Sequence, residues 1–153
     1  MNKLNNLVKK IKLYDKKNYL TLDKCIDENA FLDRLAFSLK NGVDIIEFDP
    51  TPFQTQKAIN LSKKIKQLCD VFDTTFIIRE RLDIAFTIAA DGVILTTTSF
   101  TPEQAREILG ENALLGILCN SIEDFNIAIS TTADFIKTLN FVKPTIKTSK
   151  IIF

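Results

Sequence analysis

The sequence predicts an α/β protein built as a partial TIM-barrel-like (β/α) array of about six parallel strands. Short β-branched segments alternate with helical segments along the whole chain. Most of the short segments are nearly continuous apolar runs, which is typical of parallel strands that helices cover on both faces. Together these two patterns favour repeated βα units over an antiparallel or all-helical fold.

A weak internal repeat supports the same fold class. The segments 42–46, 90–94 and 132–136 are similar to one another and lie about 45 residues apart. Each combines a small residue with an aspartate where a strand is expected to begin. The repeating unit is therefore two βα steps, as in a (β/α) barrel or a doubly wound sheet.

Six segments are predicted to be strands, because each is short and rich in β-branched or aromatic residues. They are 19–22, 43–48, 75–78, 92–97, 114–118 and 134–139.

Five helices are expected between these strands. Segment 28–40 has apolar residues at helical spacing and ends at Asn41 and Gly42, and segment 54–71 carries a second apolar stripe. Thr101, Pro102 and Gln104 form a capping-box pattern that opens a helix over 102–109. Shorter helices are expected over 82–88 and 121–129.

The predicted number of strands is too small for a closed barrel. A closed barrel of this type contains eight strands, and the segment after residue 141 has room for only one more, so the last two βα units are missing. The expected organisation is an N-terminal helical extension over 1–17, a βα domain over 18–141 and a C-terminal tail over 142–153. Exposed sheet edges predict self-association. A flavodoxin-like open sheet is the alternative.

Composition excludes several classes of function. The 20 basic and 19 acidic residues nearly cancel, so we expect no nucleic-acid partner and no membrane partner. No apolar run approaches the roughly 18 residues of a membrane span, and no signal peptide is evident, so a cytoplasmic location is expected. The chain has no histidine, so any metal would require carboxylates and would be magnesium or calcium. The three cysteines are predicted to be buried thiols: Cys25, Cys69 and Cys119.

The amino-acid sequences of several segments also resemble those of a known protein family. The matching runs are 42–48, 76–85, 90–95, 105–110, 115–117 and 132–136. Over about residues 19–147 they resemble the thiamine-phosphate synthase / TenI family of (β/α) barrels. The resemblance implies a reaction at the carboxyl ends of the strands, where hydroxymethylpyrimidine diphosphate loses pyrophosphate to a thiazole phosphate in the presence of magnesium.

The residues expected at that site depart from the family pattern. Glu47, Asp49 and Thr51 stand where the family has glutamine, arginine and lysine, and Arg79 and Glu80 stand where it has asparagine and a metal-binding aspartate. The segment 96–99 lacks the family's second metal carboxylate, and no glycine follows Gly116 to form the phosphate-binding loops.

The resemblance still implies candidate site residues. Arg79, Thr97 and Lys147 are the substrate-binding candidates, for a phosphorylated small molecule, and Glu80, Glu47 and Asp49 are the candidates for magnesium. The residues themselves leave a second interpretation open, in which the carboxylates pair with nearby basic residues. For Arg79, an ion pair with Glu47 or Asp49 is favoured over an anionic ligand.

These departures predict a degenerate, non-catalytic family member that acts as a binding or interaction module, as a homo-oligomer or docked to a related protein. Two alternatives remain open. One is an active thiamine-phosphate synthase that uses magnesium and whose site another subunit completes. The other is a structural or regulatory subunit that docks on a full-length enzyme.

Overall fold

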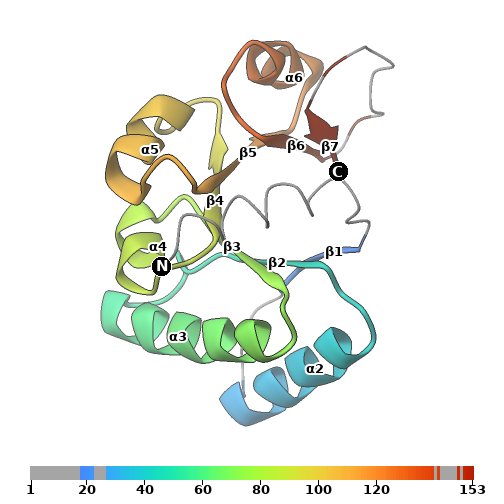
Figure 1. Cartoon of the computed structure of the whole chain (residues 1–153), viewed down its shortest axis with the longest axis vertical. Helices are drawn as coiled ribbons and strands as arrows, with labels where there is room; N and C mark the ends of the chain where they lie inside the picture. The colour runs from blue at the N-terminus through green and yellow to red at the C-terminus, as the bar shows by residue number, and fades with distance from the viewer. Residues whose placement is uncertain (1–17, 23–26, 140, 142–147, 149) are drawn as a thin grey trace.

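The structure is a computed structural model of the 153-residue chain, and it describes residues 18–22, 27–139, 141, 148 and 150–153. A single sheet contains seven strands in the order β1-β2-β3-β4-β5-β6-β7, and every neighbouring pair is parallel. The sheet curls into a half-barrel, with the helices packed around its convex face (Figure 1). This confirms the predicted partial (β/α) barrel.

The elements follow the predicted order closely. The strands are β1 (Tyr19–Thr21), β2 (Ile45–Phe48), β3 (Thr75–Arg79), β4 (Gly92–Thr96), β5 (Leu114–Cys119), β6 (Phe135–Thr138) and β7 (Ile151–Ile152). The helices within the described residues are α2 (Glu28–Lys40), α3 (Thr55–Val71), α4 (Leu82–Thr87), α5 (Pro102–Leu109) and α6 (Ile122–Ile129). The predicted tail thus contributes the seventh strand, and the predicted extension over 1–17 lies outside the described residues.

The strand order decides between the two predicted architectures. A flavodoxin-like sheet reverses its direction of growth after the first strands, which places β1 between β2 and β3. Here each strand pairs with its successor along the chain, from Tyr19 opposite Ile45 to Ile136 opposite Ile152. The flavodoxin-like alternative is therefore wrong, and the order is that of a barrel.

Alternating side chains divide the apolar residues into two layers. Ile46, Phe76 and Ile78 face outward and pack with the helices, whereas Ile45 and Ile77 face the concave side. The concave layer also contains Ile94, Leu114, Leu118 and Phe135. A strand buried on both faces must be apolar at nearly every position, which explains the continuous apolar runs in the sequence.

The repeated aspartates connect the strands in pairs. Each aspartate stands just before an even-numbered strand, and its carboxylate accepts a hydrogen bond from a backbone N–H at, or one residue before, the start of the preceding strand. The bonds run from Asn18 to Asp44 at 3.0 Å, from Phe76 to Asp91 at 2.8 Å and from Leu115 to Asp134 at 2.9 Å. The repeat seen in the sequence is therefore a repeated structural unit of two strands.

Helix ends follow the sequence signals. The Thr101 hydroxyl accepts a hydrogen bond from the N–H of Gln104 at 3.2 Å, and the Gln104 side chain accepts one from the N–H of Thr101 at 3.0 Å, which completes the capping box. Gly110 follows with φ of +93°, a backbone conformation that favours glycine.

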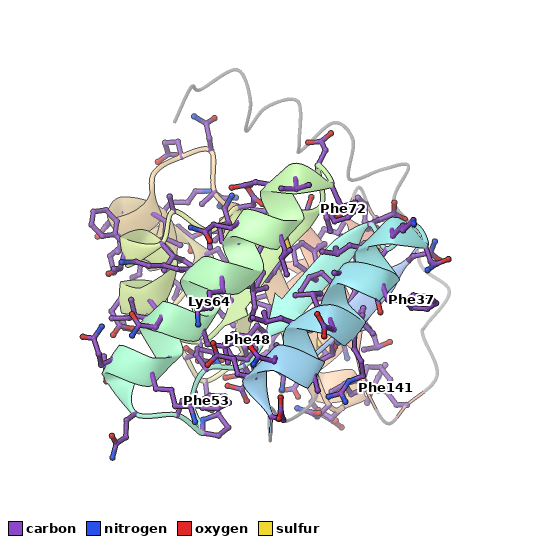
Figure 2. All side chains as sticks on the ribbon, turned by 90° about the horizontal axis from the view of Figure 1, so that it is seen from below. Phe37, Phe48, Phe53, Lys64, Phe72 and Phe141 are labelled. Atoms are coloured by element: carbon purple, nitrogen blue, oxygen red, sulfur yellow. The ribbon has the colours of Figure 1, made fainter. Side chains whose placement is uncertain are left out.

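The helices of the convex face bury most of their apolar residues. Figure 2 shows Phe48 and Phe53 close together between α2 and α3, and their ring centroids are 5.8 Å apart. Phe37 instead points away from α3 and is 71% exposed. Within the described part of the chain, no helix is both long enough and apolar enough to span a membrane.

Two of the three predicted buried thiols are described. Cys69 and Cys119 are buried and not in a disulfide. Burial, assisted by the nearby carboxylate of Asp124, raises the pKa of the Cys119 thiol to about 12. Cys25 lies outside the described residues.

Candidate functional site

Five polar side chains meet on the concave face near the carboxyl ends of the strands. Tyr19 and Thr21 come from β1, Glu47 from β2, Arg79 from β3 and Lys137 from β6. We call these five residues the Glu47 cluster. Each of them stands two positions along its strand from another residue that faces the concave side. Because side chains alternate along a strand, all five therefore face the inside of the half-barrel.

The Glu47 carboxylate is saturated with donors. Its Oε1 accepts a hydrogen bond from Arg79 Nε at 2.6 Å and pairs with the Nη2 of the same guanidinium. Its Oε2 accepts hydrogen bonds from Tyr19 at 2.7 Å, from Thr21 at 3.3 Å and from Lys137 Nζ at 2.6 Å. The Glu47 side chain is fully buried, so donors of the protein replace all of its water.

The cluster fixes the ionisation of its members. Burial acts to raise the pKa of the Glu47 carboxyl, but the charge and hydrogen bond of Lys137, with Arg79 and Tyr19, hold this pKa below the ordinary value of 4.5. Burial, then the charge and hydrogen bond of Glu47, raise the pKa of the Tyr19 phenol well above 10.0. At neutral pH the cluster therefore holds an ionised glutamate and a neutral tyrosine.

Other contacts hold the donors in place. Lys137 Nζ also donates to the Thr21 hydroxyl at 2.5 Å and lies 4.7 Å from the centroid of the Tyr19 ring, as in a cation–π contact. The Tyr19 ring packs against Phe153 and Phe135, with centroid separations of 5.1 Å and 6.4 Å. The positions of these donors do not depend on Glu47 alone.

Asp49 lies at the margin of the cluster. Its Oδ2 is 4.0 Å from Nη1 of Arg79, while its Oδ1 accepts hydrogen bonds from the N–H of Thr51 at 3.0 Å and from the Thr51 hydroxyl at 2.6 Å. The structure thus pairs Arg79 chiefly with Glu47 and only distantly with Asp49. The ion-pair interpretation of Arg79 is confirmed.

The Glu80 carboxylate points to β4 and not to the Glu47 cluster. Its backbone φ is +61°, an uncommon conformation for a glutamate, and its Oε1 accepts a hydrogen bond at 2.6 Å from the N–H of Thr96 at the end of β4. Glu80 therefore fastens the β3–α4 connection to β4.

The three predicted metal ligands do not fit a magnesium ion in this arrangement. Magnesium requires carboxylate oxygens that can turn to the ion, whereas Glu47 is saturated and the bonds of Asp49 and Glu80 lead to different neighbours. Among the residues that the structure describes, no three His, Cys, Asp or Glu side chains form a group able to hold a metal. The structure does not bring these three carboxylates together, and magnesium binding by Glu80, Glu47 and Asp49 stays a prediction.

The remaining substrate-binding candidates lie apart from the cluster. Thr97 donates its hydroxyl to Asp124 Oδ1 at 2.7 Å and helps line a cavity of about 290 Å³ between the β4–α5 connection and α6. Phe100 and Ile127 also line this cavity, but no member of the Glu47 cluster does. Lys147 lies outside the described residues. Substrate binding by Arg79, Thr97 and Lys147 stays a prediction.

Sequence reasoning missed Tyr19, Thr21 and Lys137 as members of the site. For Lys137 a signal was present, since it is the one charged residue within the otherwise apolar or neutral strand β6. It also shares the alternation of Phe135, which faces the concave side. Tyr19 and Thr21 gave no such signal, because both residue types are common in strands.

The sequence model of a family described as thiamine monophosphate synthase matches residues 18–150. The thiamine-phosphate synthase of Methanobrevibacter smithii is 32% identical over 118 residues, which is 77% of this chain and 56% of that protein. The corresponding protein of Fusobacterium nucleatum is 34% identical over 125 residues, covering 81% of this chain and 61% of that protein.

A solved structure agrees with these matches. Thiamine phosphate pyrophosphorylase from Pyrococcus furiosus superimposes with a TM-score of 0.70 at 25% sequence identity, and the match covers 80% of this chain and 59% of that one. The chain thus spans a little over half the length of the relatives that it matches.

Proposed function

The chain belongs to the thiamine monophosphate synthase family, and from this premise we propose that it serves thiamine biosynthesis as a synthase-like domain without synthase activity of its own. In this role it acts as a binding or interaction module. The observation that supports the proposal is the saturated Glu47 carboxylate at the carboxyl ends of the strands, where barrel enzymes of this architecture bind their substrates.

Charge is the first reason. A diphosphate substrate needs cations and hydrogen-bond donors that are not already engaged. Arg79 and Lys137 both pair with Glu47, and the carboxylate lies where a diphosphate would approach them. Because both cations already engage this carboxylate, a diphosphate could bind them only by displacing the Glu47 side chain.

Stabilisation of the leaving group is the second reason. Loss of pyrophosphate separates charge, and a bound cation would normally stabilise the departing group. The carboxylates of Glu47, Asp49 and Glu80 do not fit magnesium in this structure. Within the part of the chain that the structure describes, the cluster at the carboxyl ends of the strands therefore offers neither a metal site nor unpaired cations for this step.

The interaction role is supported by the shape of the sheet. The half-barrel has seven strands, and β1 and β7 are the first and last of them. A sheet of parallel strands that does not close is normally covered at its ends by other elements or another subunit. A second copy or a related protein of the same family would provide such cover, and self-association is part of this proposal.

A turnover assay tests the catalytic part. Purified protein, shown by circular dichroism to be folded, is incubated with hydroxymethylpyrimidine diphosphate, thiazole phosphate and magnesium beside a competent family member. We expect no thiamine phosphate above the protein-free background. Product formed by the wild-type chain and lost in Glu80→Ala, but kept in the control Glu28→Ala, would overturn the proposal in favour of an active synthase.

Light scattering after size-exclusion chromatography tests the interaction part. We expect a mass that corresponds to two or more copies of the 17.3 kDa chain, or a complex when a full-length relative is added. A monomer that binds no relative would remove the interaction role and leave small-molecule binding as the function to examine.

A further inference from the structure

The Glu47 cluster has the composition of an oxyanion site. A guanidinium, an ammonium, a phenol and a hydroxyl converge on one point from strands β1, β3 and β6. This set of donors is the kind that proteins use to bind phosphate, sulfate or carboxylate ligands. Here the anion at the centre is the side chain of Glu47.

The charges of the Glu47 cluster also favour an oxyanion site. Arg79 and Lys137 supply two positive charges at the centre of the cluster, and Glu47 supplies one negative charge. The side chains of both cations are mostly buried, at 23% and 12% exposure, so water neutralises them poorly. Asp49 lies 4.0 Å from Arg79 and offers only a distant second negative charge.

Three of the four donors, Lys137, Thr21 and Tyr19, also make contacts that do not involve the carboxylate. Lys137 is bonded to Thr21 and lies over the ring of Tyr19, and that ring packs against Phe135 and Phe153. The strands themselves fix the backbone positions of these residues through the parallel sheet. The arrangement of Lys137, Thr21 and Tyr19 is therefore expected to persist when the carboxylate is removed, with Arg79 kept on the same face by its position in β3.

We propose that Glu47 is the internal occupant of an oxyanion-binding site made by Arg79, Lys137, Tyr19 and Thr21, and that a free oxyanion of the phosphate class takes its place when the carboxylate is withdrawn. The wild-type site is closed by its own side chain, so external phosphate does not enter it. This inference does not depend on whether the chain is a synthase, since it concerns only the state of the donors.

Phosphate-dependent stability of Glu47 variants is the test. Glu47→Ala removes the carboxylate and leaves space, whereas Glu47→Gln removes the charge but fills nearly the same volume. The control is Glu28→Ala at the start of α2, which breaks an ion pair with Lys64 outside the cluster. Tm is measured in phosphate and in chloride at matched ionic strength, and phosphorus NMR measures binding of inorganic phosphate directly.

In chloride, both Glu47 variants are expected to lose on the order of 10 °C in Tm, because two buried cations have lost their partner. In phosphate, only Glu47→Ala is expected to regain at least half of that loss, in a saturable manner and with a broadened phosphorus signal. Adding Lys137→Met to Glu47→Ala removes half of the cationic charge and is expected to abolish the recovery. Wild type and Glu28→Ala share only the small general stabilisation that phosphate gives to folded proteins.

Several results would overturn the inference. One is a folded Glu47→Ala protein that gains no more from phosphate than wild type does. Another is equal recovery in Glu47→Gln, which would indicate screening of charge and not occupation of a site. A third is phosphate binding by wild type as tight as that by Glu47→Ala.

If Glu47→Ala does not fold in either buffer, Glu47→Ser is measured in the same way, because its hydroxyl keeps the site polar and its small size leaves space for phosphate. Absence of phosphate stabilisation in that variant overturns the inference. None of these readouts involves synthase activity, so they distinguish failure of this inference from failure of the proposed function.

Discussion

The carboxylate of Asp91, just before β4, accepts a hydrogen bond at 2.8 Å from the backbone N–H of Phe76 in β3. Asp91 is only 2% exposed, so water cannot replace this bond. The equivalent bonds made by Asp44 and Asp134 join β1 to β2 and β5 to β6. A single residue type at one position thus connects three pairs of strands in the same way.

Loss of the Asp91 carboxylate is expected to destabilise the fold. Asp91→Ala leaves a buried N–H without its acceptor, which costs about 1–3 kcal/mol in the free energy of unfolding. Asp91→Asn keeps an acceptor oxygen and is expected to cost less. Urea denaturation measures both, and Asp33→Ala on the exposed face of α2 is the control, with an expected change within about 0.5 kcal/mol.

A methyl group at Gly92 is expected to disrupt the pairing of β4 with β5. A Cβ there would lie 2.0 Å from the backbone oxygen of Leu114, whereas a Cβ at Gly116 would lie 2.3 Å from the Phe135 ring. A ring can shift, but a backbone carbonyl inside a sheet cannot move without breaking its hydrogen bonds. Gly92→Ala should therefore cost more than the roughly 1–3 kcal/mol of ordinary overpacking, and more than Gly116→Ala. Equal Tm values for the two variants would contradict this expectation.

Ala89 offers a stabilising substitution. It is exposed after α4 and has φ of +53°, a left-handed conformation that disfavours a residue with a Cβ. Ala89→Gly is expected to raise the free energy of unfolding by about 0.5–1 kcal/mol. Ala30→Gly, the same substitution in the regular helix α2, should lower it by a similar amount. A destabilising Ala89→Gly would show that the strain at this position is negligible.

Glu47 should make stability dependent on acidic pH. Its pKa is lowered in the folded state, so its contribution is fully present above the ordinary value of 4.5 and is lost as pH falls through the lower folded-state pKa. Glu47→Gln is expected to be less stable at neutral pH and to lose less stability below pH 4.5. Urea midpoints measured from pH 7 down to pH 3 give the two slopes.

The comparison of the slopes isolates Glu47 from other carboxyls. Asp83 and Asp124 also have lowered pKa values, through hydrogen bonds from Arg81 and from Thr97 respectively, and contribute equally to both proteins. Parallel slopes in wild type and Glu47→Gln would show that the cluster does not hold the carboxyl in its ionised form.

Most of the fold was predictable because its signals are local. Helix α5 is specified by Thr101, Pro102 and Gln104 within four residues, and the strands are specified by short apolar runs. The ion pair of Arg79 with Glu47 was also within reach, since both residues stand at the carboxyl ends of neighbouring strands. The short strand β7 was the exception, because two isoleucines carry little pattern.

The rest of the site depends on features that no local pattern contains. Lys137 reaches Glu47 across the concave face, and this contact requires the curvature of the whole sheet. Glu80 was a candidate metal ligand from its position alone, and no sequence pattern indicated its positive φ or the hydrogen bond that its carboxylate accepts from the N–H of Thr96. Backbone conformation and sheet curvature therefore decided which polar side chains came together.

The bond between Lys137 and Glu47 also has a kinetic consequence. It joins residues 90 positions apart, so its formation must close a long segment of chain after the neighbouring βα units have formed. Contacts that form late stabilise the native state without speeding its formation. This bond is therefore expected to act mainly as a barrier to unfolding, because it holds β2 and β6 together across the concave face once they have met.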